Sequence, residues 1–281
     1  MNKAILAIPL LILGLGNGKR PAIGQEIGTL SPDRALMPSL LAGPRDPSTS
    51  SSLLFVGGNP NSHGRGVEAE VSIGATLPAI LLKGKNGGHP VVVGIEAAVF
   101  ARFGLQVLER ELIASDWVFA IPVVWHRDRG WFRFRYYHTS SHMGDEYARR
   151  FEDPGIDFSR DAAEILYFHA PFHCFGIYGG ARYAYNVHPE ESKRWVLRAG
   201  GQLETQEMDV NLRPFFAADV EWDQDAGRSP RLELRAGVGL RKVGILRTLR
   251  LSLTFLTGPS PLGQFNGKTT TQAGLTIQKT L

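Results

Sequence analysis

A histidine and a serine, His138 and Ser140, stand two residues apart in a segment with the alternating pattern of a β-strand. Alternate side chains of a strand point to the same face, so the two would share a face with about 6–7 Å between their Cα atoms. Such a pair can lean together into a hydrogen bond, which is what a serine nucleophile needs from a histidine base. The spacing therefore predicts acyl-transfer chemistry, with Ser140 as the nucleophile and His138 as the base.

An acid should orient the imidazole and stabilise its charged form. The following strand runs back beside the first, and pairing across the intervening loop places Glu164 opposite Ser140 to within about two residues. Leu166 and Phe168 alternate in step with Glu164, so the three share one face of their strand. If the strand spans a membrane, this apolar face lies against lipid, and Glu164 is then predicted to lie on the lipid-facing side with His138 and Ser140. Asp161 is the second candidate for the acid.

Two loop acids, Asp145 and Glu146, are further candidates for the same role. With Gly144 they could also hold calcium, because hard cations want clustered carboxylates. Zinc bound by His138 and His142 is disfavoured, since four residues of a strand span roughly 13 Å. The sequence predicts no bound cofactor and leaves calcium as an option.

The strand at 131–142 must position the pair. Phe132 and Phe134 precede it on the same face, whereas Arg133 and Arg135 point the other way. In a soluble protein the aromatic face would be core, and in an outer-membrane barrel it would face lipid, with the arginines lining a wet lumen. A His and a Ser on a lipid-facing surface are costly, which indicates a function. The alternative is that they only hydrogen-bond lipid headgroups or the adjoining loop.

Alternation of this kind recurs along the chain in segments of about ten residues, the length of a tilted membrane-spanning strand. Strands of soluble sandwiches, the rival fold, average only about 5–6 residues. We predict an all-β protein, a single antiparallel transmembrane β-barrel of about 12 strands. The strands are expected near 51–57, 66–77, 91–105, 115–126, 131–142, 162–174, 175–187, 195–204, 210–222, 231–241, 246–257 and 269–281.

Charged residues recur in the middle of the polar faces, and both signs are present. A barrel of twelve strands has a narrow lumen that side chains can fill. We therefore expect a plugged lumen of mutually paired charges more than a selective pore. All five tryptophans fall at predicted strand ends, as two interfacial girdles require. The lumen residues are Arg102, Arg133, Arg135, Glu68, Glu70 and Glu96, and the tryptophans are Trp117, Trp125, Trp131, Trp195 and Trp222.

The chain divides into three parts. Residues 1–24 read as a signal peptide, with a basic start, an apolar run too short to span a bilayer and a small-x-small cleavage site. Residues 25–50, rich in Pro, Ser, Gly and charge, are expected to form a mobile periplasmic leader, and 51–281 the barrel. The net charge of +4 includes three basic residues of the signal peptide, so it says little about nucleic acid. The single cysteine excludes an internal disulfide, and no phosphate loop, dinucleotide fingerprint or nucleic-acid motif is present.

The tripeptide His138-Thr139-Ser140 resembles the outward-facing His-x-Ser pair of two families, outer-membrane phospholipase A and the lipid A deacylase. In those families Asn follows the Ser, where this chain has Ser141. Their third residue is Asn or Glu on a following strand, so the resemblance implies a lipid hydrolase with an acid or amide behind the histidine. The string 138–146, followed by 159–161, also looks like a family of outer-membrane barrels filed as a domain of unknown function, which implies the fold and the location.

Together these patterns predict an exported protein of a Gram-negative outer membrane, with membrane lipids or lipopolysaccharide as partners. The leading functional hypothesis is a serine acyl-ester hydrolase that acts on membrane lipid. The alternative is a non-enzymatic barrel, namely a narrow channel, a transporter or a structural membrane protein. A surface receptor or adhesin built on loop 143–161 is a third hypothesis.

Overall fold

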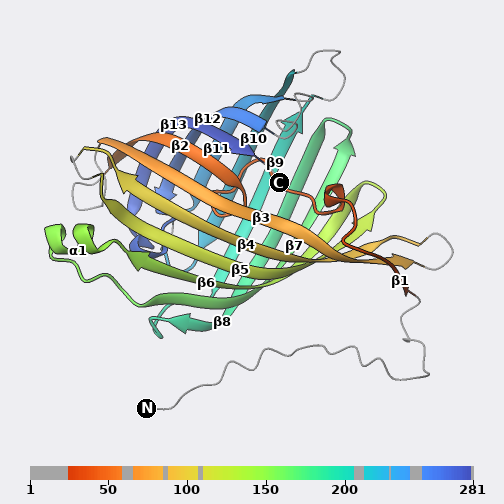
Figure 1. The fold of residues 1–281 in the computed structure, drawn as a ribbon, viewed down its shortest axis with the longest axis horizontal. Helices are drawn as coiled ribbons and strands as arrows, with labels where there is room; N and C mark the ends of the chain where they lie inside the picture. The colour runs from red at the N-terminus through yellow and green to blue at the C-terminus, as the bar shows by residue number, and fades with distance from the viewer. Residues whose placement is uncertain are drawn as a thin grey trace.

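The computed structural model describes residues 25–58, 66–84, 88–106, 110–205, 212–227, 229–240 and 249–279. Within them, twelve antiparallel strands form one closed barrel, in which each pairs with its neighbours in sequence and β13 pairs with β2 (Figure 1). The predicted fold is confirmed, and each predicted segment contains one strand, whereas the predicted signal peptide lies outside the described residues. The strands are β2 (Thr49–Gly58), β3 (Gly66–Gly84), β4 (Val91–Gly104), β5 (Leu112–Arg127), β6 (Gly130–Met143), β7 (Phe158–Phe172), β8 (Phe175–His188), β9 (Trp195–Glu204), β10 (Leu212–Asp223), β11 (Arg231–Leu240), β12 (Leu249–Pro259) and β13 (Thr269–Lys279).

Helical structure in the described residues is limited to α1 (Asp145–Phe151) and the 3-10 turns η1 (Arg34–Leu36) and η4 (Gly263–Phe265). No helix of this described part is long and apolar enough to cross a membrane. Figure 1 shows α1 at one end of the barrel and the short strand β1 (Gln25–Leu30) at the other. We refer to these as the α1 end and the β1 end.

The two faces of β6 separate as its sequence predicts. Phe134 and Tyr136 are 56% and 48% exposed on the outer wall, whereas Arg133 and Arg135 are buried inside. Strand alternation therefore sends the aromatic side chains toward lipid and the guanidinium groups into the lumen.

Charges inside the barrel are paired between strands. Arg102 contacts Glu68 and Glu70 at 2.9 and 2.8 Å, and Arg135 contacts Glu96 at 2.7 Å. An unpaired buried charge would cost several kcal/mol, on the order of 3–5, so each guanidinium needs a carboxylate beside it. These contacts make the lumen an interlocked network rather than an open aqueous passage.

Residues 25–50, for which the sequence predicts a mobile leader, include a short strand and a segment that lies inside the barrel. β1 pairs with the last residues of β3, where Gln25 lies opposite Gly84 and Leu30 opposite Ile80. Residues 37–48, which we call the plug segment, then run inside the ring of strands (Figure 1). The leader can lie inside the barrel because the lumen wall offers it an apolar surface and charged side chains that pair with its own charges.

Contacts of the plug segment change in character along its length. Leu40 packs in an apolar cluster with Val92, Val124, Trp131 and Leu166 of the wall. Beyond it, Gly43 donates its backbone N–H to Glu233 at 2.6 Å. Gly43 has a φ of +130°, and a Cβ there would collide with the Arg198 and Asp46 side chains. A glycine is therefore required where the plug crosses the charged network.

Two charged residues anchor the plug segment further along. Arg45 contacts Asp116 at 2.9 Å and Glu70 at 3.3 Å, and Asp46 contacts Arg198 at 2.7 Å. Because both ends of these pairs are mostly shielded from water, they hold the segment more firmly than exposed pairs would.

A second segment enters the lumen from the α1 end. Residues 260–268, which we call the cap segment, include η4 and connect β12 to β13. Leu262 and Phe265 are each 1% exposed and pack with Ile113 and Tyr147. Gln264 donates to the backbone oxygen of Ser141 at 2.6 Å. Plug and cap together fill the described barrel from both ends.

The substitution Asp46→Asn should loosen the plug segment. Burial raises the pKa of Asp46, but the guanidinium groups of Arg198 and Arg133 outweigh it and hold the pKa below its usual value. A lowered folded-state pKa gives stability that is present above about pH 3.9 and is lost as the pH falls through the folded value. We expect faster amide hydrogen exchange over 37–48 in Asp46→Asn at neutral pH, and in the unaltered protein on strong acidification.

The matched control for this prediction is Asp128→Asn, in an exposed turn between β5 and β6. The rate of amide hydrogen exchange over the plug segment of this control should equal that of the unaltered protein. If the rate in Asp46→Asn were also unchanged, the charge of Asp46 would not anchor the plug.

Candidate functional site

His138 of β6 and Asp161 of β7 lie directly opposite each other in the strand register. The Nδ1 atom of the imidazole is 2.7 Å from Oδ1 of the carboxylate, on the outer wall of the barrel. The histidine side chain is 46% exposed and the aspartate 15%. With Nδ1–H donating to the carboxylate, Nε2 is left as the basic nitrogen, which is the tautomer that a general base needs.

Asn186 of β8 completes a chain of hydrogen bonds across three strands. Its Nδ2 donates to the second carboxylate oxygen of Asp161 at 2.9 Å. The β7–β8 register shifts between Asp161 and Ala162, so Tyr185 and Asn186 both point outward instead of alternating. Such a β-bulge re-aims a side chain, and here it turns the amide toward Asp161. The sequence analysis missed Asn186, because no local pattern announces a bulge.

Ser140 lies two residues beyond His138 on the same face, with Trp117 and Ser159 as its cross-strand neighbours. No hydrogen bond joins Ser140 to His138 in the described part of the chain, and His138 Nε2 has no partner there either. Catalytic hydrogen bonds are often long before substrate binds and tighten in the complex. The site thus has a histidine positioned by a carboxylate and a serine two residues away on the same face.

An apolar groove of about 500 Å³ lies on the outer wall, and His138 is one of its lining residues. Two small residues of the lining, Ala75 and Ala97, lie opposite each other in the strand register and leave space for the groove. Larger side chains border this pair, and the groove has little polar surface. The bordering residues include Ile73, Val99, Trp117 and Phe119.

Glu164, the first candidate for the acid, lies on the opposite side of the wall from the one predicted. It is 2% exposed inside the lumen and contacts Arg133 and Arg135, each at 2.9 Å. The prediction took Leu166 and Phe168 as lipid-facing, but both pack against the plug segment in the lumen. The plug segment creates an apolar patch inside the barrel. In this part of β7 the apolar side chains therefore face the lumen and not the lipid.

The same patch explains the one tryptophan that turns inward. Trp131 is 6% exposed and stacks on Phe168 with ring centroids 5.2 Å apart. Trp117, Trp125 and Trp195 are between 41% and 53% exposed on the outer wall, as an interfacial girdle requires.

Asp145 and Glu146 are exposed in the first turn of α1. Neither contacts His138, whose acid is Asp161. The described residues contain no group of three or more His, Cys, Asp or Glu side chains placed to hold a metal ion. These two acids by themselves do not fit a calcium site, which needs six or more oxygen ligands.

Comparison with known proteins gives both a family and a fold. Residues 21–279 match the family model described as "Protein of unknown function (DUF1207)", and no curated protein matches the chain. The chain is similar to outer membrane phospholipase A from Escherichia coli, with a TM-score of 0.55 and 11% identity over 83% of this chain and 93% of that one. The calcium-bound dimer of the Salmonella typhi outer membrane phospholipase gives a TM-score of 0.54 and 10% identity, over 83% of this chain and 91% of that one. At these identities the likeness shows the fold alone, an outer-membrane-type β-barrel.

Proposed function

The chain belongs to the DUF1207 family of outer-membrane-type β-barrels, and we propose that it hydrolyses acyl esters of membrane lipids at its outer wall. The observation that carries this proposal is the 2.7 Å contact between His138 and Asp161, two residues from an outward-facing serine. A histidine oriented by a carboxylate, beside a serine and on a surface bathed in lipid, is poorly explained by stability alone.

In the proposed reaction Ser140 Oγ attacks the ester carbonyl carbon while its proton passes to His138 Nε2. Asp161 stabilises the imidazolium that forms, and Asn186 holds the carboxylate in place. Collapse of the tetrahedral intermediate breaks the ester C–O bond, and the proton on Nε2 passes to the departing alcohol. Water then hydrolyses the acyl-serine by the same base, which releases the fatty acid and restores Ser140.

The groove supports a lipid substrate rather than a water-soluble ester. Its volume of about 500 Å³ lies within the range of roughly 300–1,000 Å³ usual for small-molecule sites. An acyl chain lying over Ala75 and Ala97 would bring its carbonyl toward His138. Trp117, exposed beside Ser140, marks a height typical of the membrane interface, where lipid esters lie.

Similarity to outer membrane phospholipase A adds support, because that protein has the same fold and acts on phospholipid. In this proposal the carboxylate of Asp161 orients the imidazole, and the amide of Asn186 lies behind the carboxylate. The calcium named in one of these relatives enters no step of the proposal.

The rival function, a narrow channel, is disfavoured by the occupied lumen. The plug and cap segments both contact Asp116 of the inner wall, through the Arg45 side chain of the plug and the backbone N–H of Gly263 in the cap. A non-enzymatic structural barrel remains the alternative that experiment has to exclude.

A long-chain alkyl phosphonofluoridate should label Ser140 covalently. The serine oxygen would displace fluoride from phosphorus in the same geometry in which it attacks an ester. Peptide mass spectrometry should find the adduct on Ser140 and not on Ser141, which is buried and hydrogen-bonded to Asp116. Loss of the base in His138→Ala should slow labelling at least about 100-fold. A folded barrel that takes no label, or that is labelled equally fast without His138, would contradict the proposal.

A further inference from the structure

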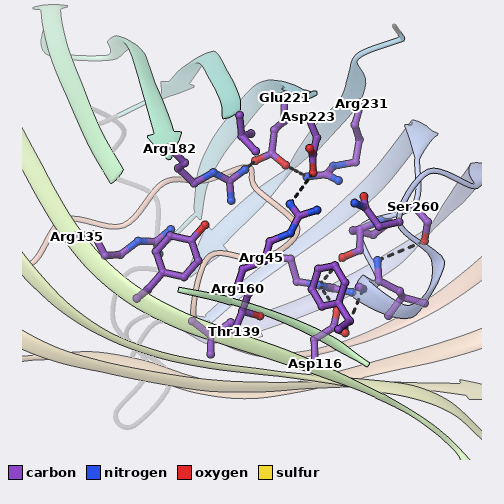
Figure 2. Close-up of a pocket in the computed structure, with 18 residues that line it drawn as sticks. Arg45, Asp116, Arg135, Thr139, Arg160, Arg182, Glu221, Asp223, Arg231 and Ser260 are labelled. Atoms are coloured by element: carbon purple, nitrogen blue, oxygen red, sulfur yellow. Dashed lines mark hydrogen bonds and ion pairs between the residues drawn. The ribbon is translucent and has the colours of Figure 1, made fainter. Parts of the chain in front are cut away.

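A partly open cavity of about 90 Å³ lies inside the barrel between the plug and cap segments (Figure 2). It is separated by the barrel wall from the proposed hydrolase site. Its lining is unusual in its charge, because it brings together five guanidinium groups and three carboxylates. The arginines are Arg45, Arg135, Arg160, Arg182 and Arg231, and the acids are Asp116, Glu221 and Asp223.

Three of the arginines have carboxylate partners of their own. Arg135 contacts Glu96 and Glu164, and Arg160 contacts Asp223 at 3.0 Å and Asp225 at 2.7 Å. Arg45 is matched by Asp116 and Glu70 of the wall. Positive charge at these three positions is therefore compensated.

Arg182 and Arg231, in contrast, share one carboxylate. Both contact Glu221, one on each of its oxygens, as Figure 2 shows. Arg182 otherwise approaches only the outer range of an ion pair with Glu164, at 3.9 Å. Arg182 is partly buried and Arg231 is buried, so two guanidinium groups on one carboxylate leave a local excess of positive charge, which is costly in a low-dielectric interior.

Unused hydrogen-bond donors surround the same cavity. Nη2 of Arg45 and Nε of Arg182 and Arg231 are buried and unpartnered within the described chain. Tyr137, which is 7% exposed, also lines the cavity. Buried polar groups are nearly always hydrogen-bonded, so donors left over on several sides of one cavity point to a missing acceptor.

We propose that this cavity binds a small tetrahedral oxyanion, phosphate or sulfate. The cavity volume of about 90 Å³ accommodates a small anion. Arginine forks match the geometry of such anions with paired N–H donors. The bound anion would join the plug through Arg45 to the wall through Arg182, Arg231 and Tyr137, and so lock the filled lumen.

The test is stabilisation by a defined anion in protein purified without phosphate or sulfate. Thermal unfolding in detergent should shift upward with phosphate in a saturable manner, by an amount that chloride at equal ionic strength does not give. These anions also stabilise proteins by exclusion from the surface. The decisive comparison is therefore with Tyr137→Phe and Arg231→Gln, which should weaken the apparent phosphate affinity at least about tenfold.

Arg235→Gln is the matched control, because Arg235 is also a buried lumen arginine but does not line the cavity. Its phosphate response should equal that of the unaltered protein. Arg231→Gln relieves the excess charge, so without anion it should be at least as stable as the unaltered protein. A direct measurement is ion chromatography after denaturation of protein loaded with phosphate, which should release about one anion per chain from the folded barrel. No release, or equal phosphate responses in the control and the two cavity variants, would overturn the proposal.

Discussion

Ser140→Ala should reduce the release of fatty acid by the purified barrel at least about 10³-fold, the usual loss when the nucleophile of a serine hydrolase is removed. His138→Ala should cause a loss of similar size, because nucleophile and base act as one unit. The double variant should lose no more than either single variant. Fatty acid released from phospholipid vesicles and from lipopolysaccharide, measured separately, would also decide between these two substrate classes.

Asp161→Asn should keep the fold and lose about 10⁴-fold in rate, because an amide would hold the imidazole in the wrong tautomer. The matched control is His142→Ala, on the same strand and the same outer face as His138. It should leave the rate unchanged, as should Glu164→Gln if that variant folds. A rate that survives in Ser140→Ala, or that falls equally in His142→Ala, would show that this strand does not carry the chemistry.

Replacement of both inserted segments should convert a closed barrel into a conducting one. We expect the unaltered protein to show no discrete conductance steps in planar bilayers, because the plug and cap segments occupy the described lumen from both ends. A variant with Gly/Ser linkers in place of 37–46 and 261–267 keeps β1 and every strand of the barrel. It should show discrete steps, since twelve strands enclose a lumen that only these segments and the wall side chains fill.

The two single replacements separate the contributions of the segments. Each leaves one obstruction in place, so each should conduct less than the double variant. Folding of each barrel should first be confirmed by its resistance to unfolding in cold detergent. Steps in the unaltered protein, or a folded double variant that stays silent, would contradict the account of a plugged lumen.

Local pattern was enough to determine the fold. The period-2 alternation of β6 places Phe134 outside and Arg135 inside, and similar runs give all twelve strands, because lipid and water select opposite side chains on the two faces of one strand. The partners of Arg102 and Arg135 were also within reach of the sequence, since a buried guanidinium requires a nearby carboxylate.

The acid of the site was only half determined by sequence. Asp161 and Glu164 were both acceptable in the pattern, and register decides between them: His138 faces Asp161, whereas Glu164 faces Arg135. A register error of a few residues is beyond what strand periodicity can resolve. Asn186 depended in addition on a bulge in β8, which only the pairing of the strands reveals.

The sequence by itself determined which residues alternate, which strands form and that His138 and Ser140 share the lipid side. Tertiary structure alone decided what fills the lumen. A leader rich in proline, glycine and charge has no periodicity of its own, and it lies inside the barrel because Leu40 and Asp46 meet Leu166 and Arg198, which are more than a hundred positions away along the chain. The plug segment also gives Trp131, Leu166 and Phe168 an apolar surface to pack against inside the barrel. These side chains therefore face the lumen because of a tertiary contact that no local pattern encodes.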